Sequence, residues 1–95
     1  MNIEKSNPTP DDIEDTTTAI GLESRVVLYN DDWHSFDEVI VQLMKATQCT
    51  FEQARDFSFE VHVKGKVIVY NGSMAGCLKV SSILEEIALN TQIIT

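Results

Sequence analysis

Three polar side chains, Asn30, Asp31 and Asp32, follow directly after the apolar run 25–29. The β-branched and aliphatic residues of this run predict a core strand, which ends where the polar groups begin. A short loop held at both ends by rigid elements can present acceptors to a ligand without moving. A carboxylate and an amide in this place suit a cationic or amino-bearing ligand. On local chemistry alone, an Asx turn that starts the following helix explains the same three residues.

Two helices are predicted in tandem after this loop. Capping boxes of the type S/T-x-x-E/Q begin at Ser35 and Thr50. Apolar residues then recur at helical spacing over 36–47 and again over 51–63. Gly65 is placed to take the left-handed conformation that ends the second helix.

The rest of the chain predicts a strand, a third helix and a last strand. A β-branched run over 66–70 stops at an Asn-Gly turn at 71–72, and Ser73 can cap a helix whose apolar face covers 74–87. Residues 92–95 form a last short strand. The element order is β-α-α-β-α-β, and a three-stranded antiparallel sheet with the helices on one face makes a two-layer α+β sandwich.

Length and charge narrow the candidate functions. At 95 residues with 43% hydrophobic content, the chain can form one domain with a modest core and little room for a buried active-site cleft. Residues 1–24 carry six acids and one lysine, a charge of −5 within a total of −8. They predict a disordered acidic arm before a folded domain over 25–95. Because an acidic protein is repelled by phosphate backbones and anionic headgroups, we expect no nucleic-acid and no membrane partner.

The two cysteines, Cys49 and Cys77, have no CxxC spacing and no histidine in a ligand pattern. They predict free thiols in a reducing compartment rather than a disulfide framework. The residues after Met1 lack the charged-then-apolar order of a signal peptide, and no apolar run approaches transmembrane length. We therefore expect a cytoplasmic protein without a metal or other cofactor.

Two linked motifs resemble the ClpS family of Clp-protease adaptors. They are V-L-Y-N-D-D-W over 27–33 and V-H-V-K-G-K over 61–66, and Lys79-Val80 inside the third helix agrees with the same family. The similarity covers 25–95. It implies a ClpS-like fold and a non-enzymatic bacterial adaptor that binds the N-terminal residue, or N-degron, of degradation substrates. It also implies delivery of substrates with bulky hydrophobic N-terminal residues to an AAA+ unfoldase of ClpA or ClpC type.

The resemblance implies that Asn30, Asp31 and His62 bind the substrate α-amino group. That group is a cation with three N–H donors, so a tight site needs about three acceptors, including a carboxylate. Asp31 would supply charge, Asn30 a side-chain carbonyl and His62 a neutral ring nitrogen. Asp32 and His34 are candidate rim residues. Without the loop, His62 would rather be interpreted as a helix-end histidine satisfied by a carbonyl.

The resemblance also implies an apolar hole for the substrate side chain. Its walls would be Phe36, Val39, Ser58, Val61 and, near the C-terminus, Ile93 or Ile94. Typical members have methionine at Phe36 and Ser58, threonine at His34 and proline at Ser35, so the depth and preference of the hole stay open. Ordinary core packing explains an apolar stripe such as Phe36 and Val39 equally well.

Docking on the unfoldase is implied to use Lys79. The family pairs this lysine with a Glu at the start of the third helix, where Met74 or Ala75 stands here, so we expect weaker docking or a different partner. A solvated charge is the alternative for Lys79.

Two other classes of function stay open. The C-terminal domain of the ribosomal stalk protein shares this architecture, so a non-catalytic docking module without N-degron specificity is the first alternative. A small enzyme or metal protein using His34, His62 and the acids is the second, although the sequence lacks a paired nucleophile and base and a set of three or four ligands.

Overall fold

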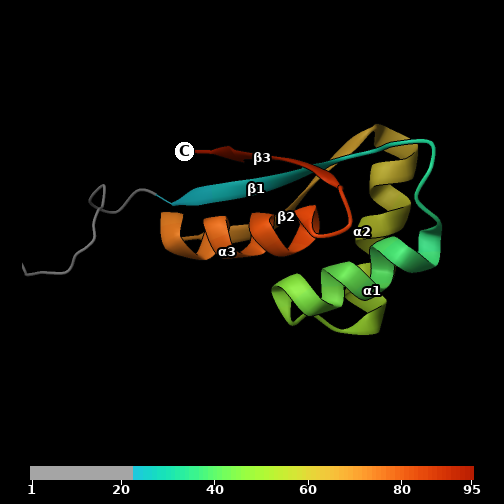
Figure 1. The fold of residues 1–95 in the computed structure, drawn as a ribbon, viewed down its shortest axis with the longest axis horizontal. Helices are drawn as coiled ribbons and strands as arrows, with labels where there is room; N and C mark the ends of the chain where they lie inside the picture. The colour runs from blue at the N-terminus through green and yellow to red at the C-terminus, as the bar shows by residue number, and fades with distance from the viewer. Residues whose placement is uncertain (1–22) are drawn as a thin grey trace, which may run out of the picture.

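Six helices and strands follow one another in the order β-α-α-β-α-β over residues 23–95, the part of the chain that this computed structural model describes (Figure 1). Their bounds are β1 Ser24–Tyr29, α1 Phe36–Thr47, α2 Phe51–Lys64, β2 Lys66–Gly72, α3 Met74–Glu85 and β3 Asn90–Ile94. The predicted element order and fold class are confirmed. The predicted arm over 1–24 lies outside the described residues, apart from Glu23 and Ser24.

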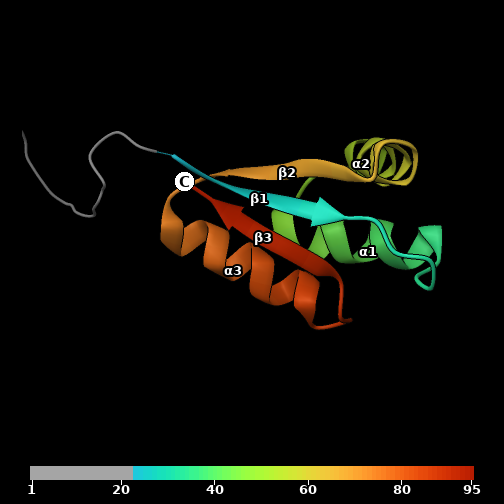
Figure 2. The same ribbon diagram turned by 90° about the horizontal axis from the view of Figure 1, so that it is seen from above.

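β1 is the central strand of a three-stranded sheet, with β2 and β3 paired antiparallel on its two edges (Figure 2). Val26, Val27 and Leu28 are only 0%, 4% and 1% exposed. A strand paired on both edges and covered by helices excludes water from nearly every position, which explains its uninterrupted apolar run. A β-bulge shifts the register with β2 between Val26 and Val27.

The turn predicted at Asn71-Gly72 is wrong, because both residues extend β2. They pair with the first two residues of β1, so the ladder runs further than the apolar run 66–70 indicates. The chain leaves the sheet at Ser73, whose side chain accepts a hydrogen bond from the Gly76 amide and caps α3.

The helices share one core with the inner face of the sheet, and α2 lies near the end where β1 stops and β2 starts (Figure 2). The buried core consists of Val26, Leu28, Val39, Ile40, Leu43, Ala46, Ala54, Val61, Val67, Val69, Cys77, Val80, Leu84 and Leu89. Both cysteines are free thiols. Both predicted capping boxes form, with Ser35 and Thr50 as the N-caps of α1 and α2.

A polar contact joins α1 to the end of α3. Gln42 is 6% exposed, and its Nε2 donates to the carbonyl of Ile83 at 2.6 Å and to Glu86 Oε1 at 3.3 Å. Lys45 forms an exposed ion pair with the same Glu86 carboxylate at 2.8 Å. The Ile83 carbonyl in the last turn of α3 also accepts from the Glu86 amide at 3.1 Å, so Gln42 adds a second donor and ties α1 to this turn.

Candidate functional site

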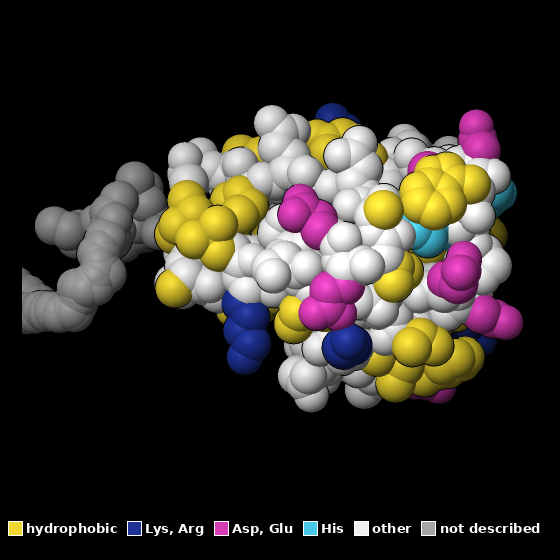
Figure 3. All heavy atoms as spheres, in the orientation of Figure 1, with side chains coloured by type: hydrophobic (Ala, Val, Ile, Leu, Met, Phe, Trp, Pro, Cys, Tyr) yellow, Lys and Arg dark blue, Asp and Glu magenta, His cyan; other side chains and the backbone are white. Residues whose placement is uncertain are grey.

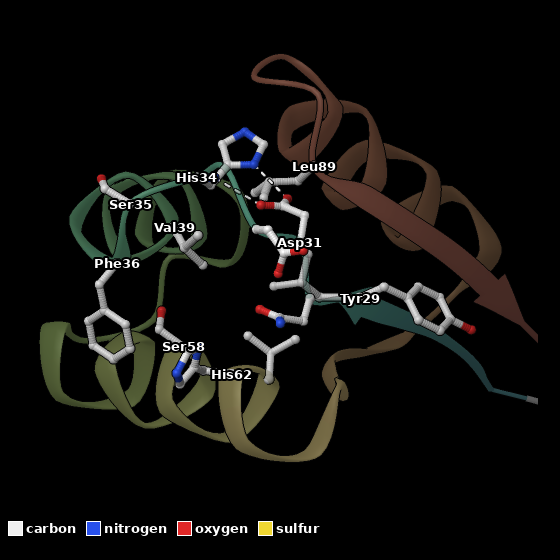
Figure 4. A pocket seen from close by; sticks show the side chains of 13 residues that line it. Tyr29, Asp31, His34, Ser35, Phe36, Val39, Ser58, His62 and Leu89 are labelled. Carbon is white, nitrogen blue, oxygen red and sulfur yellow. Dashed lines mark hydrogen bonds and ion pairs between the residues drawn. The ribbon is translucent and has the colours of Figure 1, made fainter.

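A hollow of about 300 Å³ opens where β1 ends, between the loop after β1 and helix α2 (Figure 4). This volume is at the lower end of the usual range for ligand pockets, about 300–1,000 Å³. The hollow is lined by Leu28, Tyr29, Asn30, Asp31, Asp32, His34, Ser35, Phe36, Val39, Ser58, Val61, His62 and Leu89. Nine of the residues predicted for the amine site, the side-chain hole and the rim are in this lining: Asn30, Asp31, Asp32, His34, Phe36, Val39, Ser58, Val61 and His62.

Residues 30–35 connect β1 to α1 and are called the acceptor loop; a backbone hydrogen bond holds this loop against the end of α2. The amide of Asn30 donates to the carbonyl of Gly65 at 2.9 Å. Gly65 is the C-cap of α2, with a left-handed φ of 90°, and its own amide donates to the carbonyl of Val61. His62 lies in the last turn of α2, so this brace places the loop and His62 on facing sides of one opening.

Asp31 organises the loop through its carboxylate. Oδ1 accepts hydrogen bonds from the amides of Trp33 at 3.1 Å and His34 at 2.9 Å, which is the Asx turn that local chemistry favours. Oδ2 lies 2.6 Å from Nδ1 of the His34 ring. Burial raises the pKa of the Asp31 carboxyl, but these hydrogen bonds outweigh burial and lower the pKa below its ordinary 3.8. The loop therefore has a fixed carboxylate, and a turn-forming role does not exclude a place in the pocket.

His34 is the least expected member of the site, because both nitrogens of its ring form hydrogen bonds within the protein. Its side chain is only 3% exposed, Nδ1 faces Asp31, and Nε2 lies 2.5 Å from the carbonyl of Ile87, beyond the end of α3. Burial lowers the pKa of the imidazole, but the bonds to Asp31 and Ile87 and the charges of Asp31 and Glu38 outweigh burial and raise the pKa above 6.5. Two acceptors around one ring favour the imidazolium form, in which both nitrogens donate.

The apolar walls have the predicted residues but an unexpected surface at Ser58. Val39 and Val61 are buried at 9% and 5% exposure, and Phe36 is 41% exposed at the opening. The Ser58 hydroxyl donates to the Ala54 carbonyl at 2.8 Å, one turn back in its own helix. Ser58 therefore presents a small wall whose donor is already used. In Figure 4, Phe36, Ser58 and His62 surround one side of the hollow and Asp31 and His34 the other.

The remaining wall comes from Leu89, which the sequence analysis missed. The contribution predicted from Ile93 or Ile94 is wrong, since neither residue lines this hollow and Ile94 lines a separate one on the sheet. The reason is strand direction: β3 is antiparallel to β1, so its first residue, Asn90, pairs with Tyr29 beside the pocket and Ile94 lies at the far end. The ring of Tyr29 points away from the hollow, where its hydroxyl donates to Gln92 at 2.6 Å.

Lys79, predicted to dock an unfoldase, is exposed on α3 and lies outside the pocket lining. Figure 3 shows apolar side chains exposed at the end of the molecule where α3 begins, and Met74 and Leu78 are 45% and 56% exposed there. Over residues 23–95, no group of three or more His, Cys, Asp or Glu side chains is arranged to hold a metal ion.

Comparison with known proteins agrees with the fold and with the two motifs. Residues 23–92 match the family described as ATP-dependent Clp protease adaptor protein ClpS. The structure is similar to that of Agrobacterium tumefaciens ClpS2 bound to L-phenylalaninamide, with a TM-score of 0.68, 19% identity and coverage of 75% of this chain and 93% of that chain. A Drosophila melanogaster relative, E3 ubiquitin-protein ligase UBR1, is 30% identical over 76 residues, which are 79% of this chain and 4% of the length of that protein.

Proposed function

The chain belongs to the ClpS family of ATP-dependent Clp protease adaptors, and we propose that it binds the N-terminal residue of protein substrates and delivers them to a Clp unfoldase of ClpA or ClpC type. The observation that carries the proposal is the convergence of Asn30, Asp31 and His62 at the rim of a hollow that has apolar walls. An amino terminus needs both parts, because its ammonium group is polar and the adjacent side chain is not.

The amine would be bound by acceptors from two elements. A carboxylate offers about four lone-pair positions, and three of those on Asp31 accept from the Trp33 amide, the His34 amide and the His34 ring. One position on Oδ2 is left for a substrate N–H. The side-chain carbonyl of Asn30 and a ring nitrogen of His62 would accept the other two protons, with the carboxylate of Asp32 at the rim.

The side chain of the substrate would fill the hollow between Phe36, Val39, Ser58, Val61 and Leu89. Aromatic and aliphatic groups gain about 25 cal/mol for each Å² of apolar surface removed from water. Because the Ser58 hydroxyl already donates within its own helix, the walls bind a substrate side chain through apolar contact rather than through a specific hydrogen bond. We therefore expect Phe and Leu to bind better at the N-terminus than small or charged residues.

A peptide pair that differs only in its amino terminus tests this binding. A fluorescent peptide that begins with a free Phe should bind, and the same peptide with an acetylated Phe should not, because acetylation removes the charge and two of the donors. A third peptide with Phe moved to the second position is the control for nonspecific apolar binding. Equal binding of the free and acetylated peptides would contradict the proposal and would favour a docking module without N-degron specificity.

Delivery to the unfoldase is proposed to use α3 around Lys79, in a non-catalytic, cytoplasmic role. A Lys79→Glu variant should lose association with a ClpA- or ClpC-type partner while keeping peptide affinity, because Lys79 is outside the pocket lining. Arg55→Glu, at an exposed position of α2, is the matched charge reversal and should leave association intact. An equal loss in both variants would show that association depends on net charge and not on this face.

A further inference from the structure

The ring of His34 connects two segments that are far apart in the sequence and that both line the pocket. On one side it contacts Asp31 in the acceptor loop, at 2.6 Å, and on the other the carbonyl of Ile87, at 2.5 Å. Ile87 is two residues before Leu89, which forms a wall of the same pocket. The histidine is thus the only side chain in the described hydrogen bonds that joins the acceptor loop to the segment between α3 and β3.

We infer that His34 is a positioning residue for substrate binding. Its imidazolium ring donates a hydrogen bond from each nitrogen, one to Asp31 and one to the Ile87 carbonyl, and so fixes the distance between the Asp31 carboxylate and the wall at Leu89. The inference rests on the proposed function, since it concerns the same pocket. His34 is part of the pocket lining, but both of its ring nitrogens are bonded to the protein, so its effect on the substrate passes through Asp31 and Leu89.

The surroundings of the ring favour the charged form from two sides. Asp31 in the same loop and Glu38 in the first turn of α1 are the carboxylates that act on His34. The segment after α3 bonds to the ring through a backbone carbonyl, at the helix end where the macrodipole is negative, and its one carboxylate, Glu86, is paired with Lys45. Tyr29, Asp32 and His62 are the other titratable residues that line the pocket with Asp31 and His34. The ring of Trp33, a residue that is 66% exposed, lies against the imidazole, with centroids 3.9 Å apart.

Both bonds are available only while the ring has two N–H groups. A neutral imidazole has one donor, so loss of a proton leaves either Asp31 or the Ile87 carbonyl without its partner. The segment after α3 is otherwise a tight turn held by its own backbone, with Ala88 at a left-handed φ of 63° and its amide bonded to Glu85 at 2.9 Å. The turn is therefore rigid, and the ring decides whether the loop is attached to it.

The experiment compares the wild-type chain, His34→Thr and Gln42→Ala across pH 6 to 8.5. Threonine is short and cannot reach both acceptors. Gln42→Ala is the control for lost stability, because Gln42 ties α1 to α3 without lining the pocket. Affinity is measured with the free-Phe peptide, and nitrogen-detected NMR of the wild-type imidazole counts its N–H groups. Deprotonation of the peptide amine is common to all three chains.

We expect two N–H groups on His34 at neutral pH and a loss of affinity of about tenfold in His34→Thr at pH 6.5, the size of one modest hydrogen bond. The affinity of the wild-type chain and of Gln42→Ala should fall more steeply with rising pH than that of His34→Thr, so that the three chains converge at the alkaline end. A single N–H on His34, or parallel pH profiles in wild type and His34→Thr, would overturn the inference. Failure of the wild-type chain to bind the peptide at any pH would instead overturn the proposed function.

Discussion

The amide of Asn30 donates to the carbonyl of Gly65 across 2.9 Å, and this one bond makes the acceptor loop and the end of α2 a single unit. The bond depends on Gly65 keeping its left-handed φ of 90°, because that conformation turns the carbonyl toward the loop. A Cβ added at Gly65 would meet nothing within 4 Å. Any penalty for a larger residue there is therefore conformational and not steric.

Gly65→Ala should consequently lower the free energy of unfolding by about 1–2 kcal/mol, the cost of a left-handed alanine. Gly65→Asn should cost less, since asparagine tolerates this conformation. Chemical denaturation measures both variants, and peptide affinity should decline in the same order. If alanine and asparagine were equally stable, backbone conformation would not be the cause.

Replacement of Asp31 should damage amine binding more than replacement of Asn30. Charge-assisted hydrogen bonds contribute about 1.5–3 kcal/mol against about 1 kcal/mol for neutral ones. Asp31→Ala also removes the partner of the His34 ring and the acceptor of the Trp33 and His34 amides, so the loop loses its turn as well as its charge. Titration calorimetry with a free-Phe peptide should rank Asn30→Ala above Asp31→Ala in affinity. The reverse order would place the substrate charge contact elsewhere on the rim.

The stability of the fold should depend on pH through the same pair. Because the pKa of His34 is raised in the folded chain, its contribution is complete below the unfolded value of about 6.5 and is lost as the pH rises through the folded pKa. The pKa of Asp31 is lowered, so its contribution is present above its unfolded value of about 3.9 and is lost as the pH falls through the folded pKa. Thermal unfolding should show that His34→Thr lowers Tm more at pH 6 than at pH 9. An equal difference at both values would mean that the pair does not titrate as its geometry implies.

Gln42 and Lys45 both reach from α1 to the end of α3, and their replacement should have different consequences. Gln42→Ala removes a part-buried hydrogen bond to the Ile83 carbonyl, which keeps the Glu86 amide as a donor, and should cost about 0.5–1.5 kcal/mol of the free energy of unfolding. Lys45→Ala breaks an ion pair whose partners are 60% and 49% exposed, and should cost about 0–1 kcal/mol. Urea denaturation of the two variants checks the order. Comparable losses would mean that burial is not what separates them.

A chain that begins at Glu23 retains every residue that lines the pocket. It should bind a free-Phe or free-Leu peptide as the full chain does, because the described lining lies within residues 28–89. We expect the shortened chain to fail in stimulating degradation of the same substrate by a Clp complex, since the family resemblance implies that the unfoldase engages the acidic arm. Full stimulation would limit the arm to a solubilising role, and lost binding would move the domain boundary.

Local signals in the sequence predicted most of the fold, and the two sequence motifs predicted most of the residues that line the pocket. The capping boxes at Ser35 and Thr50 act within one turn, and the apolar run of β1 reflects the burial of Val26, Val27 and Leu28, so both can be recognised without tertiary information. Leu89 could not be found in this way, because its place depends on the antiparallel direction of β3. The role of His34 was equally hidden, since its second partner is a backbone carbonyl 53 positions away. Its one visible signal was a histidine where the family has threonine.

The position of β1 has a consequence for how the pocket behaves over time. Amide protons of a strand paired on both edges exchange with solvent only through the largest unfolding events, whereas edge strands and helix ends open more often. The acceptor loop leaves from the last residue of this strand, so its starting point should be among the slowest-exchanging parts of the chain. A binding loop anchored there has little residual freedom to lose. The entropy lost on binding then comes mainly from ordering the substrate's own N-terminus, which favours measurable affinity even though only one substrate residue enters the pocket.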